Sequence, residues 1–253
     1  MIVDIHSHII PSIDDGSKNM EMTLKMLKNA RENGTKEIIA TPHYLLEYGE
    51  ARIDEVKGYV KEINGILENN EIDIKVYSGQ EVYFTERIIE DYVKGNIGTI
   101  NDSRYMLIEF DMHKLEENTF DILYELQVRD IIPIIAHPER YKFFKEKPAF
   151  INAFIDQGYL FQMNAGSIEG KYGESARKTA KVFLDKNIYN FIGSDAHNAE
   201  TRNTGIKEAL TFIGEVNKNI IESSSAKLLN NEMIDFKGEK IKKRKSIFSF
   251  LRK

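Results

Sequence analysis

The chain has 253 residues, 42% of them hydrophobic, which is enough for one large α/β domain with a substantial core or for two small ones. Its 35 lysines and arginines face 40 aspartates and glutamates, and the net charge of −5 leaves no basic excess to bind a nucleic-acid backbone. The chain has no cysteine, which excludes disulfides, thiolate metal sites and hydrolysis by a cysteine nucleophile.

The apolar, β-branched start of the chain predicts a strand that ends in His6-Ser7-His8. The two histidines are two residues apart, so their imidazoles lie on the same side of a strand end. Such a pair is well placed to hold a metal ion. The alternative is that both are ordinary polar residues that close an edge strand.

The rest of the chain alternates between predicted strands and predicted helices. Apolar residues at helical spacing predict helices over residues 19–33, 52–69, 85–94, 116–128, 150–157 and 173–187. Short apolar runs predict strands over residues 36–44, 74–82, 104–110, 131–136, 159–164 and 189–192. Strand followed by helix, repeated about seven times, favours a single α/β domain in which parallel strands close into a TIM-like barrel. Pro133 inside a predicted strand is the one local objection.

Side chains that bind metal ions recur at the ends of these strands. In a barrel of this kind the C-terminal strand ends open on one mouth, so side chains at those ends converge although they are distant in the sequence. Five of the six histidines have this position, and only His113, which we interpret as a surface residue, does not. The strand-end residues are His6, His8, His43, Glu81, Glu109, His137, Asp195 and His197.

This set of imidazoles and carboxylates predicts more than one metal ion. Nitrogen and oxygen donors without sulfur suit Mn, Fe, Zn or Co, and the set exceeds the three or four ligands of a single-ion site, so we expect two or three ions. Asp14 is a candidate ninth ligand, with a turn or helix-cap role as the alternative. We interpret Asp15 and Glu139 as supporting or structural residues. Four ligand carboxylates and three divalent ions would leave a charge of about +2, which matches a phosphate-ester dianion.

Two arginines follow the last two histidines of this set. Arg140 is three residues after His137, and Arg202 is five residues after His197. The planar guanidinium group pairs with phosphate through two N–H groups, so these arginines favour an oxyanion substrate. A structural salt bridge is the alternative for each.

These motifs resemble those of the polymerase and histidinol phosphatase (PHP) superfamily, metal-dependent phosphoesterases with a distorted (β/α)7 barrel. The resemblance runs from Asp4 to Arg202. It is carried by DIHSH at 4–8 with Pro11 and IDDG at 13–16, TPH at 41–43, GQE at 79–81, HPER at 137–140 and SDAH at 194–197. The combination is similar to the manganese-dependent protein-tyrosine phosphatases of Gram-positive capsule and exopolysaccharide loci.

The resemblance implies three Mn²⁺ ions and hydrolysis of phosphotyrosine on a cognate, membrane-associated tyrosine kinase. By position, one ion would bind His6, His8, Glu81 and Asp195, a second Glu81, Glu109 and His137, and a third Asp14, His43 and His197. Arg140 and Arg202 would contact the phosphate. Because coordination lowers the pKa of water from 15.7 to about 7, we expect attack by a metal-activated hydroxide.

Three other functions remain open at this point. The first is a small-molecule phosphomonoesterase such as histidinol-phosphate phosphatase, which uses the same chemistry. The second is a non-catalytic regulator that binds metal and a partner, although such a protein would not need both arginines. The third, a polymerase-associated exonuclease, is disfavoured by the negative net charge.

We expect the barrel to occupy residues 1–235 and a basic amphipathic tail to occupy residues 236–253. From Lys240 to the C-terminus the chain has seven cations, no acidic residue and five large apolar residues, a pattern typical of docking on an anionic membrane surface. The alternatives are a disordered solubilising tail and a segment that packs on the acidic barrel. No secretory signal and no apolar run of ~18 residues is present, so we expect a cytoplasmic protein that reaches the inner face of the membrane through this tail.

Overall fold

Parallel strands form two sheets in the computed structural model, which describes residues 2–46 and 49–242. In the first sheet β1 (Ile2–Ser7) pairs with β2 (Thr35–Ala40), and β2 pairs with β5 (Lys75–Ser78). The second sheet has the order β10-β9-β8-β7-β6-β3-β4, and only the β3–β4 pair is antiparallel. Its strands are β3 (His43–Leu45), β4 (Gly49–Glu50), β6 (Glu81–Tyr83), β7 (Tyr105–Glu109), β8 (Ile132–Ala136), β9 (Leu160–Asn164) and β10 (Phe191–Gly193).

The two sheets together make one barrel. Strand β2 continues into β3 after Thr41 and Pro42, and β5 continues into β6 after Gly79 and Gln80. At the seam, Ser7 forms a parallel bridge with Ala196, and the His8 N–H donates to the Ala196 carbonyl at 2.9 Å. The strand positions are therefore β1, β2/β3, β5/β6, β7, β8, β9 and β10, which confirms the predicted seven-stranded α/β barrel in a single domain.

Two predicted strands are each interrupted in the structure. Residues 36–44 break at Thr41-Pro42, because Pro42 has no N–H to donate to a neighbouring strand. Residues 74–82 break at Gly79, where a Cβ atom would lie 3.0 Å from Ile39 Cγ2. In contrast, Pro133 is accommodated within β8, opposite Met106 of β7.

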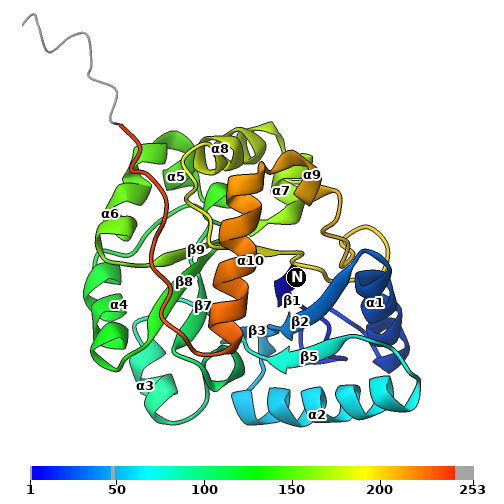
Figure 1. Cartoon of the computed structure of the whole chain (residues 1–253). Helices are drawn as coiled ribbons and strands as arrows, with labels where there is room; N and C mark the ends of the chain where they lie inside the picture. Colours follow the sequence, from blue (N-terminus) through cyan, green and yellow to red (C-terminus); the bar gives the residue numbers. More distant parts are fainter. Residues whose placement is uncertain (1, 47–48, 243–253) are drawn as a thin grey trace, which may run out of the picture.

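Helices lie outside the strands (Figure 1). They are α1 (Met20–Glu32), α2 (Ile53–Asn69), α3 (Ile88–Val93), α4 (Thr119–Val128), α5 (Lys142–Glu146), α6 (Ile151–Asp156), α7 (Ala165–Glu169), α8 (Glu174–Leu184), α9 (Ala209–Phe212) and α10 (Glu215–Leu229). The six predicted helices correspond to α1, α2, α3, α4, α6 and α8. Helix α10 contacts β1 and β10 and was not predicted, because its buried face includes Asn217, Ser224 and Ser225 and gives a weak apolar period.

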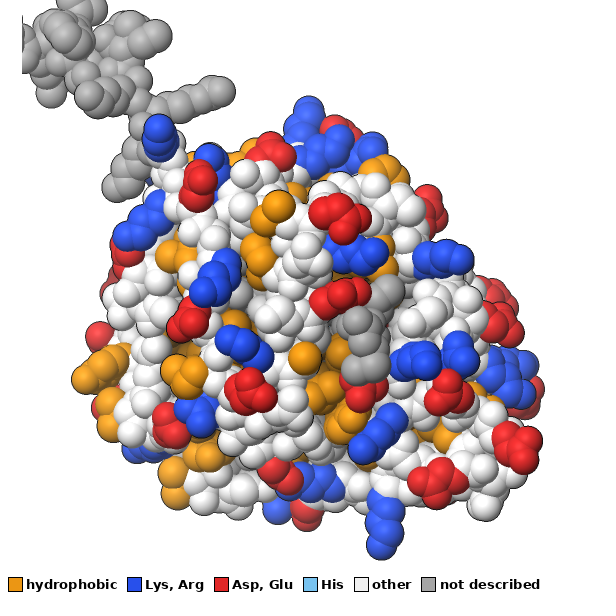
Figure 2. Space-filling view, viewed as in Figure 1, with side chains coloured by type: hydrophobic (Ala, Val, Ile, Leu, Met, Phe, Trp, Pro, Cys, Tyr) orange, Lys and Arg blue, Asp and Glu red, His pale blue; other side chains and the backbone are white. Residues whose placement is uncertain are grey.

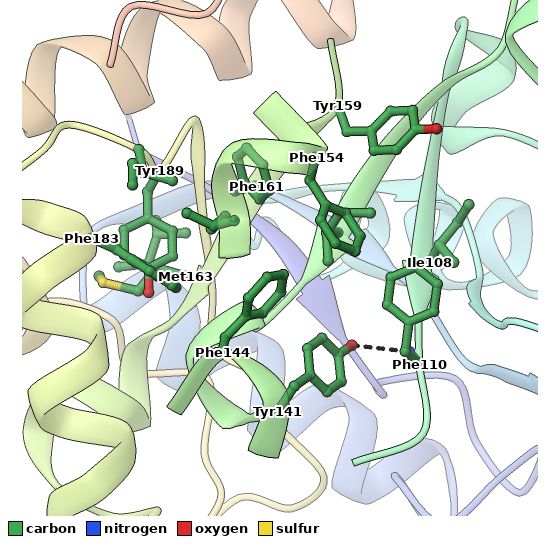
Figure 3. Packing of buried hydrophobic residues seen from close by; sticks show 14 of the residues in the cluster. Ile108, Phe110, Tyr141, Phe144, Phe154, Tyr159, Phe161, Met163, Phe183 and Tyr189 are labelled. Atoms are coloured by element: carbon green, nitrogen blue, oxygen red, sulfur yellow. Dashed lines mark hydrogen bonds between the residues drawn. The ribbon is translucent and has the colours of Figure 1, made fainter. Parts of the chain in front are cut away.

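An aromatic core anchors the segments that follow two of the candidate site residues (Figure 3). Tyr141, directly after Arg140, is fully buried, and its hydroxyl accepts a hydrogen bond from the N–H of Phe110 at 3.0 Å. Phe110 in turn follows Glu109. The Phe144 ring packs edge-to-face on Phe154 at 5.1 Å. Burial of these rings therefore fixes the chain immediately behind the barrel mouth.

A second apolar cluster fills the barrel itself. It brings together side chains from strands on different sides of the barrel, including Val3 and Ile5 of β1, Ile39 of β2, Leu107 of β7 and Phe191 of β10. All five are at most 1% exposed. The barrel is thus packed rather than hollow, and chemistry is confined to its mouth.

The chain after α10 returns across the barrel toward α6 (Figure 1). Asn152 of α6 exchanges two hydrogen bonds of 2.9 Å with the backbone of Ile241, and Lys240 pairs with Asp156. Phe236 packs on Phe161. The first part of the predicted tail, residues 236–242, therefore lies on the barrel, and the remainder, residues 243–253, is outside the described residues.

The surface carries both signs of charge. On the face shown in Figure 2, lysine and arginine side chains alternate with aspartate and glutamate side chains, and hydrophobic side chains are scattered. Within residues 2–46 and 49–242, no helix has the length and apolar character needed to cross a membrane.

Candidate metal centre

Glu81, the first residue of β6, lies among four imidazoles at the barrel mouth. Its Oε2 atom is 3.1 Å from His6 Nε2, 3.3 Å from His8 Nε2 and 3.1 Å from His43 Nδ1. Its Oε1 atom is 3.0 Å from His137 Nε2. Glu81 is 1% exposed, so one buried carboxylate faces side chains from three other strand ends.

Glu109 and Asp195 extend this group in two directions. Glu109 Oε1 is 3.5 Å from His137 Nε2, and its Oε2 is 3.9 Å from His43 Nδ1. On the other side, Asp195 Oδ1 is 3.6 Å from His8 Nε2 and 3.5 Å from His197 Nδ1. The structure therefore brings together all eight strand-end residues predicted as ligands.

The two aspartates of the Asp14-Asp15-Gly16 turn have different positions from those expected. Asp14 lies behind the centre, with Oδ2 2.8 Å from His8 Nδ1 and accepting the His43 N–H at 3.0 Å. Asp15 Oδ1 faces the centre, 3.2 Å from His197 Nε2 and 3.6 Å from His43 Nε2. Asp15, which we interpreted as structural, thus occupies the place expected for Asp14.

Hydrogen bonds on the far side of two imidazoles set their tautomers. Gln162 Oε1 lies 3.1 Å from His6 Nδ1 and also accepts a hydrogen bond from the backbone N–H of His137. The Nε2 atom of Gln162 donates to the Met163 carbonyl, which fixes Oε1 as the atom that faces His6. Because this oxygen only accepts, His6 carries a proton on Nδ1, and Nε2, which faces Glu81, is the atom left for a metal ion. Asp14 Oδ2 likewise accepts from His8 Nδ1, so the Nε2 atom of His8 is left for a metal ion. Sequence reasoning missed Gln162, whose only signal was a polar residue within an apolar strand.

The buried charges of the centre shift the pKa values of its members. Burial raises the pKa of Glu81, but His6 and His43 outweigh burial, and the pKa lies well below its ordinary value. Burial and the neighbouring charge of Glu81 raise the pKa of Glu109 well above its ordinary value. Burial and Arg140 lower the pKa of His137 to about 4, which keeps its ring neutral and its lone pair available.

Three overlapping groups of these side chains have the geometry to hold metal ions. In each group, one ligand atom per residue lies within 4.8 Å of the others. The groups are His8, Asp15, His43 and His197; His6, His8 and Glu81; and His43, Glu81 and Glu109. All their donors are nitrogen or oxygen, and His6 and His8 are held in the tautomer that ligation requires, so the residues fit a centre for Mn, Fe, Zn or Co.

Both candidate phosphate-binding arginines lie at the edge of this centre, where they donate hydrogen bonds to the Asp195 carboxylate. Arg140 Nη1 donates to Asp195 Oδ2 at 2.8 Å, and Arg202 Nη2 donates to Oδ1 at 2.7 Å. Asp195 and His137 have positive φ values of 52° and 31°, a region that residues other than glycine adopt in only a few per cent of cases. Backbone strain of this kind collects at functional sites, where the surrounding structure holds it in place.

Comparison with known proteins identifies the family of this chain. A family model described as "Capsular polysaccharide synthesis, CpsB/CapC" matches residues 2–236. The chain belongs to the CpsB/CapC family. Within this family it is 37% identical to CapC of Staphylococcus aureus over 207 residues, which cover 82% of this chain and 81% of CapC.

One further relative and one solved structure extend the likeness to nearly the full chain. The chain is 30% identical to the tyrosine-protein phosphatase YwqE of Bacillus subtilis, over 98% of this chain and 100% of YwqE. A solved structure from work on B. subtilis YwqE and Streptococcus pneumoniae CpsB, described as unique metal-dependent tyrosine phosphatases, superposes with a TM-score of 0.88. It shares 30% sequence identity and covers 96% of this chain and 100% of that chain.

We expect Asp15→Ala to lose a bound metal ion and Asp14→Ala to retain the full number of ions. Asp15 offers an oxygen inside a candidate ligand group, whereas Asp14 acts through His8. Loss of such a supporting partner weakens metal affinity by about 10- to 100-fold rather than removing a ligand. Elemental analysis of both variants, saturated with Mn²⁺ and then desalted, measures this. Loss of an ion from Asp14→Ala alone would reverse the two assignments.

Proposed function

We propose that this chain is a metal-dependent protein-tyrosine phosphatase. The observation that carries the proposal is the gathering of eight candidate ligand residues at the barrel mouth, Glu81 among them, with Arg140 and Arg202 beside them. The CpsB/CapC relatives YwqE and CpsB are named tyrosine-protein phosphatases. The reaction is hydrolysis of the phosphate ester of a protein tyrosine.

The proposed cofactor is Mn²⁺, as two or three ions, and the same donors also accept Fe, Co or Zn. The proposed ligand sets are His6, His8, Glu81 and Asp195; Glu81, Glu109 and His137; and Asp15, His43 and His197. Ions held there supply a bound water of lowered pKa and offset negative charge on the phosphoryl oxygens. The placement of Asp15 against His43 and His197 supports its inclusion in place of Asp14.

The side chains of the protein bind and orient the phosphoryl group. Arg140 and Arg202 are 21% and 37% exposed in their side chains, so both guanidinium groups reach the mouth while remaining tied to Asp195. Each has further N–H groups for a phosphoryl oxygen. The leaving tyrosine has a pKa of about 10, so it departs with less help from a general acid than an alkyl alcohol needs.

The proposed partner is a phosphotyrosyl protein, with a membrane-associated tyrosine kinase as the substrate that fits a capsule-synthesis family. A substrate panel tests this function. The metal-loaded protein is given phosphotyrosyl peptide, phosphoseryl peptide and histidinol phosphate, and we expect the highest kcat/KM for the phosphotyrosyl peptide. Preference for histidinol phosphate would indicate a small-molecule phosphatase, and hydrolysis of none of them by metal-loaded protein would indicate a non-catalytic regulator.

We also propose that the enzyme is cytoplasmic and that residues 243–253 dock it on an anionic membrane surface. Five cations and four large apolar residues support this role. Truncation after Lys242 removes the segment but keeps the Asn152–Ile241 hydrogen bonds on the barrel. We expect the truncated protein to lose salt-sensitive sedimentation with anionic vesicles and to keep its activity on phosphotyrosyl peptide. Equal sedimentation of both proteins would exclude the docking role.

A further inference from the structure

Tyr172 lies in a tight turn between α7 and α8, beside the candidate metal centre. Gly170 and Gly173 bracket it, both with positive φ (92° and 87°), and the Gly173 N–H donates to the Gly170 carbonyl at 3.1 Å. The Tyr172 ring packs against Gly166, where a Cβ atom would lie 2.7 Å from Tyr172 Cε2. The backbone of the turn and of α7 therefore fixes the place of the ring.

The guanidinium group of Arg140 lies over the Tyr172 ring. Arg140 Cζ is 4.4 Å from the centroid of the Tyr172 ring, a distance at which a cation is attracted by the π electrons. The second contact that holds Arg140 is its hydrogen bond from Nη1 to Asp195 Oδ2. In the described part of the chain no other hydrogen bond of the Arg140 guanidinium is found, so its remaining N–H groups are left for a phosphoryl oxygen.

The hydroxyl of Tyr172 faces the same carboxylate that binds both arginines. It lies 3.4 Å from Asp195 Oδ2, which also accepts from Asn164 Nδ2 at 2.7 Å. Because a carboxylate oxygen only accepts, the Tyr172 hydroxyl is the donor in this contact. Its long distance makes this the weaker of the two Tyr172 contacts.

Arg140 and Arg202 differ in whether they contact the Tyr172 ring. Arg202 is held by Asp195 and by the loop that returns from His197, whose N–H donates to the Arg202 carbonyl at 2.8 Å. Cation–π contacts within the described residues involve Lys75, Arg140 and Arg177, and none involves Arg202. An effect that passes through the Tyr172 ring should therefore reach Arg140 and spare Arg202.

We infer that Tyr172 is a positioning residue that holds the Arg140 guanidinium in the orientation in which it binds the phosphoryl group. The inference rests on the proposed phosphatase function and assigns a role to a residue outside the ligand set. The ring keeps the guanidinium plane in place while Asp195 anchors one end of it. Without the ring, Arg140 retains a single anchoring hydrogen bond and is free to rotate about it.

A double-mutant cycle tests this role. Tyr172→Leu should lower kcat/KM for a phosphotyrosyl peptide by about 10-fold, with metal content unchanged, whereas Tyr172→Phe, which keeps the ring, should stay within about twofold of the wild type. In an Arg140→Ala background the Tyr172→Leu effect should disappear. In an Arg202→Ala background most of it should persist, because the Tyr172 ring contacts Arg140 directly and is linked to Arg202 only through the long hydroxyl contact with Asp195.

Two further variants separate positioning from folding. Gly166→Ala keeps Tyr172 and suits a helix, but its Cβ atom displaces the ring, so it should give part of the same loss, again only when Arg140 is present. Tyr124→Leu on α4, at a tyrosine that is 59% exposed, is the matched control and should leave kcat/KM unchanged.

The dissociation constant of inorganic phosphate provides a readout that does not depend on phosphotyrosine turnover. It should rise about 10-fold in metal-loaded Tyr172→Leu and should not rise further when Tyr172→Leu is added to Arg140→Ala. Wild-type activity in Tyr172→Leu, an equal loss in both arginine backgrounds, or loss of metal from Tyr172→Leu would each overturn the inference. If the wild type hydrolysed no phosphotyrosyl peptide, the proposed function would fail, and the phosphate cycle would still decide the role of Tyr172.

Discussion

Glu81→Ala should lower kcat/KM for a phosphotyrosyl peptide by at least about 10³ and reduce the number of bound metal ions. Four imidazole nitrogens lie within 3.3 Å of the Glu81 carboxylate, one each from His6, His8, His43 and His137. Glu81 belongs to two candidate metal-binding groups, one with His6 and His8 and one with His43 and Glu109. Removing it would take a ligand from two of the proposed ion positions at once. Activity and elemental analysis of the same preparations measure both effects.

His43→Ala provides the comparison for Glu81→Ala, because it removes one imidazole from the same centre and leaves the Glu81 carboxylate in place. We expect a smaller loss of activity and of metal than in Glu81→Ala. Glu81→Gln keeps the shape of the side chain and tests whether its charge is required. A full metal complement and near-normal turnover in Glu81→Ala would show that Glu81 does not bridge ions.

Arg140→Ala and Arg202→Ala should each lower kcat/KM by about 10² or more, a loss of ~2 to 3 kcal/mol of transition-state stabilisation. Metal content should be unchanged, because neither guanidinium belongs to a ligand set. Lysine at either position should restore little activity, since an ammonium group cannot reproduce the bidentate fork of arginine.

Arg31→Ala is the matched control for the arginine variants. Arg31 lies in the last turn of helix α1 and pairs with the exposed Asp73, away from Asp195, so its loss should leave kinetics and metal content unaltered. Wild-type kinetics in both Arg140→Ala and Arg202→Ala would assign these two residues to structural ion pairs with Asp195.

The barrel and the strand-end residues were predictable because both follow from patterns that are local in the sequence. Alternating strands and helices favour parallel strands, and parallel strands in a barrel end on one mouth. His43 and His137 could therefore be placed near His6 although they are distant in the sequence. The ligand roles themselves remain proposals that the metal measurements test.

Other parts of the site depend on which way a side chain points, and local sequence patterns do not determine that orientation. Asp14 and Asp15 are adjacent in one turn, and which of them faces His197 depends on how Gly16 packs; a Cβ atom there would lie 2.2 Å from the His8 carbonyl oxygen. Tyr172 reaches Arg140 only because the turn between two glycines folds back over α7. Such contacts arise from tertiary packing and have no periodic signal.

The dependence of phosphotyrosine hydrolysis on this centre is tested most directly by removing its metal and returning it. The kcat/KM for a phosphotyrosyl peptide is measured after exhaustive chelation, after addition of Mn²⁺, and after treatment of the reloaded enzyme with a thiol alkylating agent. We predict no activity after chelation, full recovery with Mn²⁺ and no effect of the alkylating agent, because the chain has no cysteine. Full activity in protein shown by elemental analysis to be free of metal would contradict a metal-dependent phosphatase.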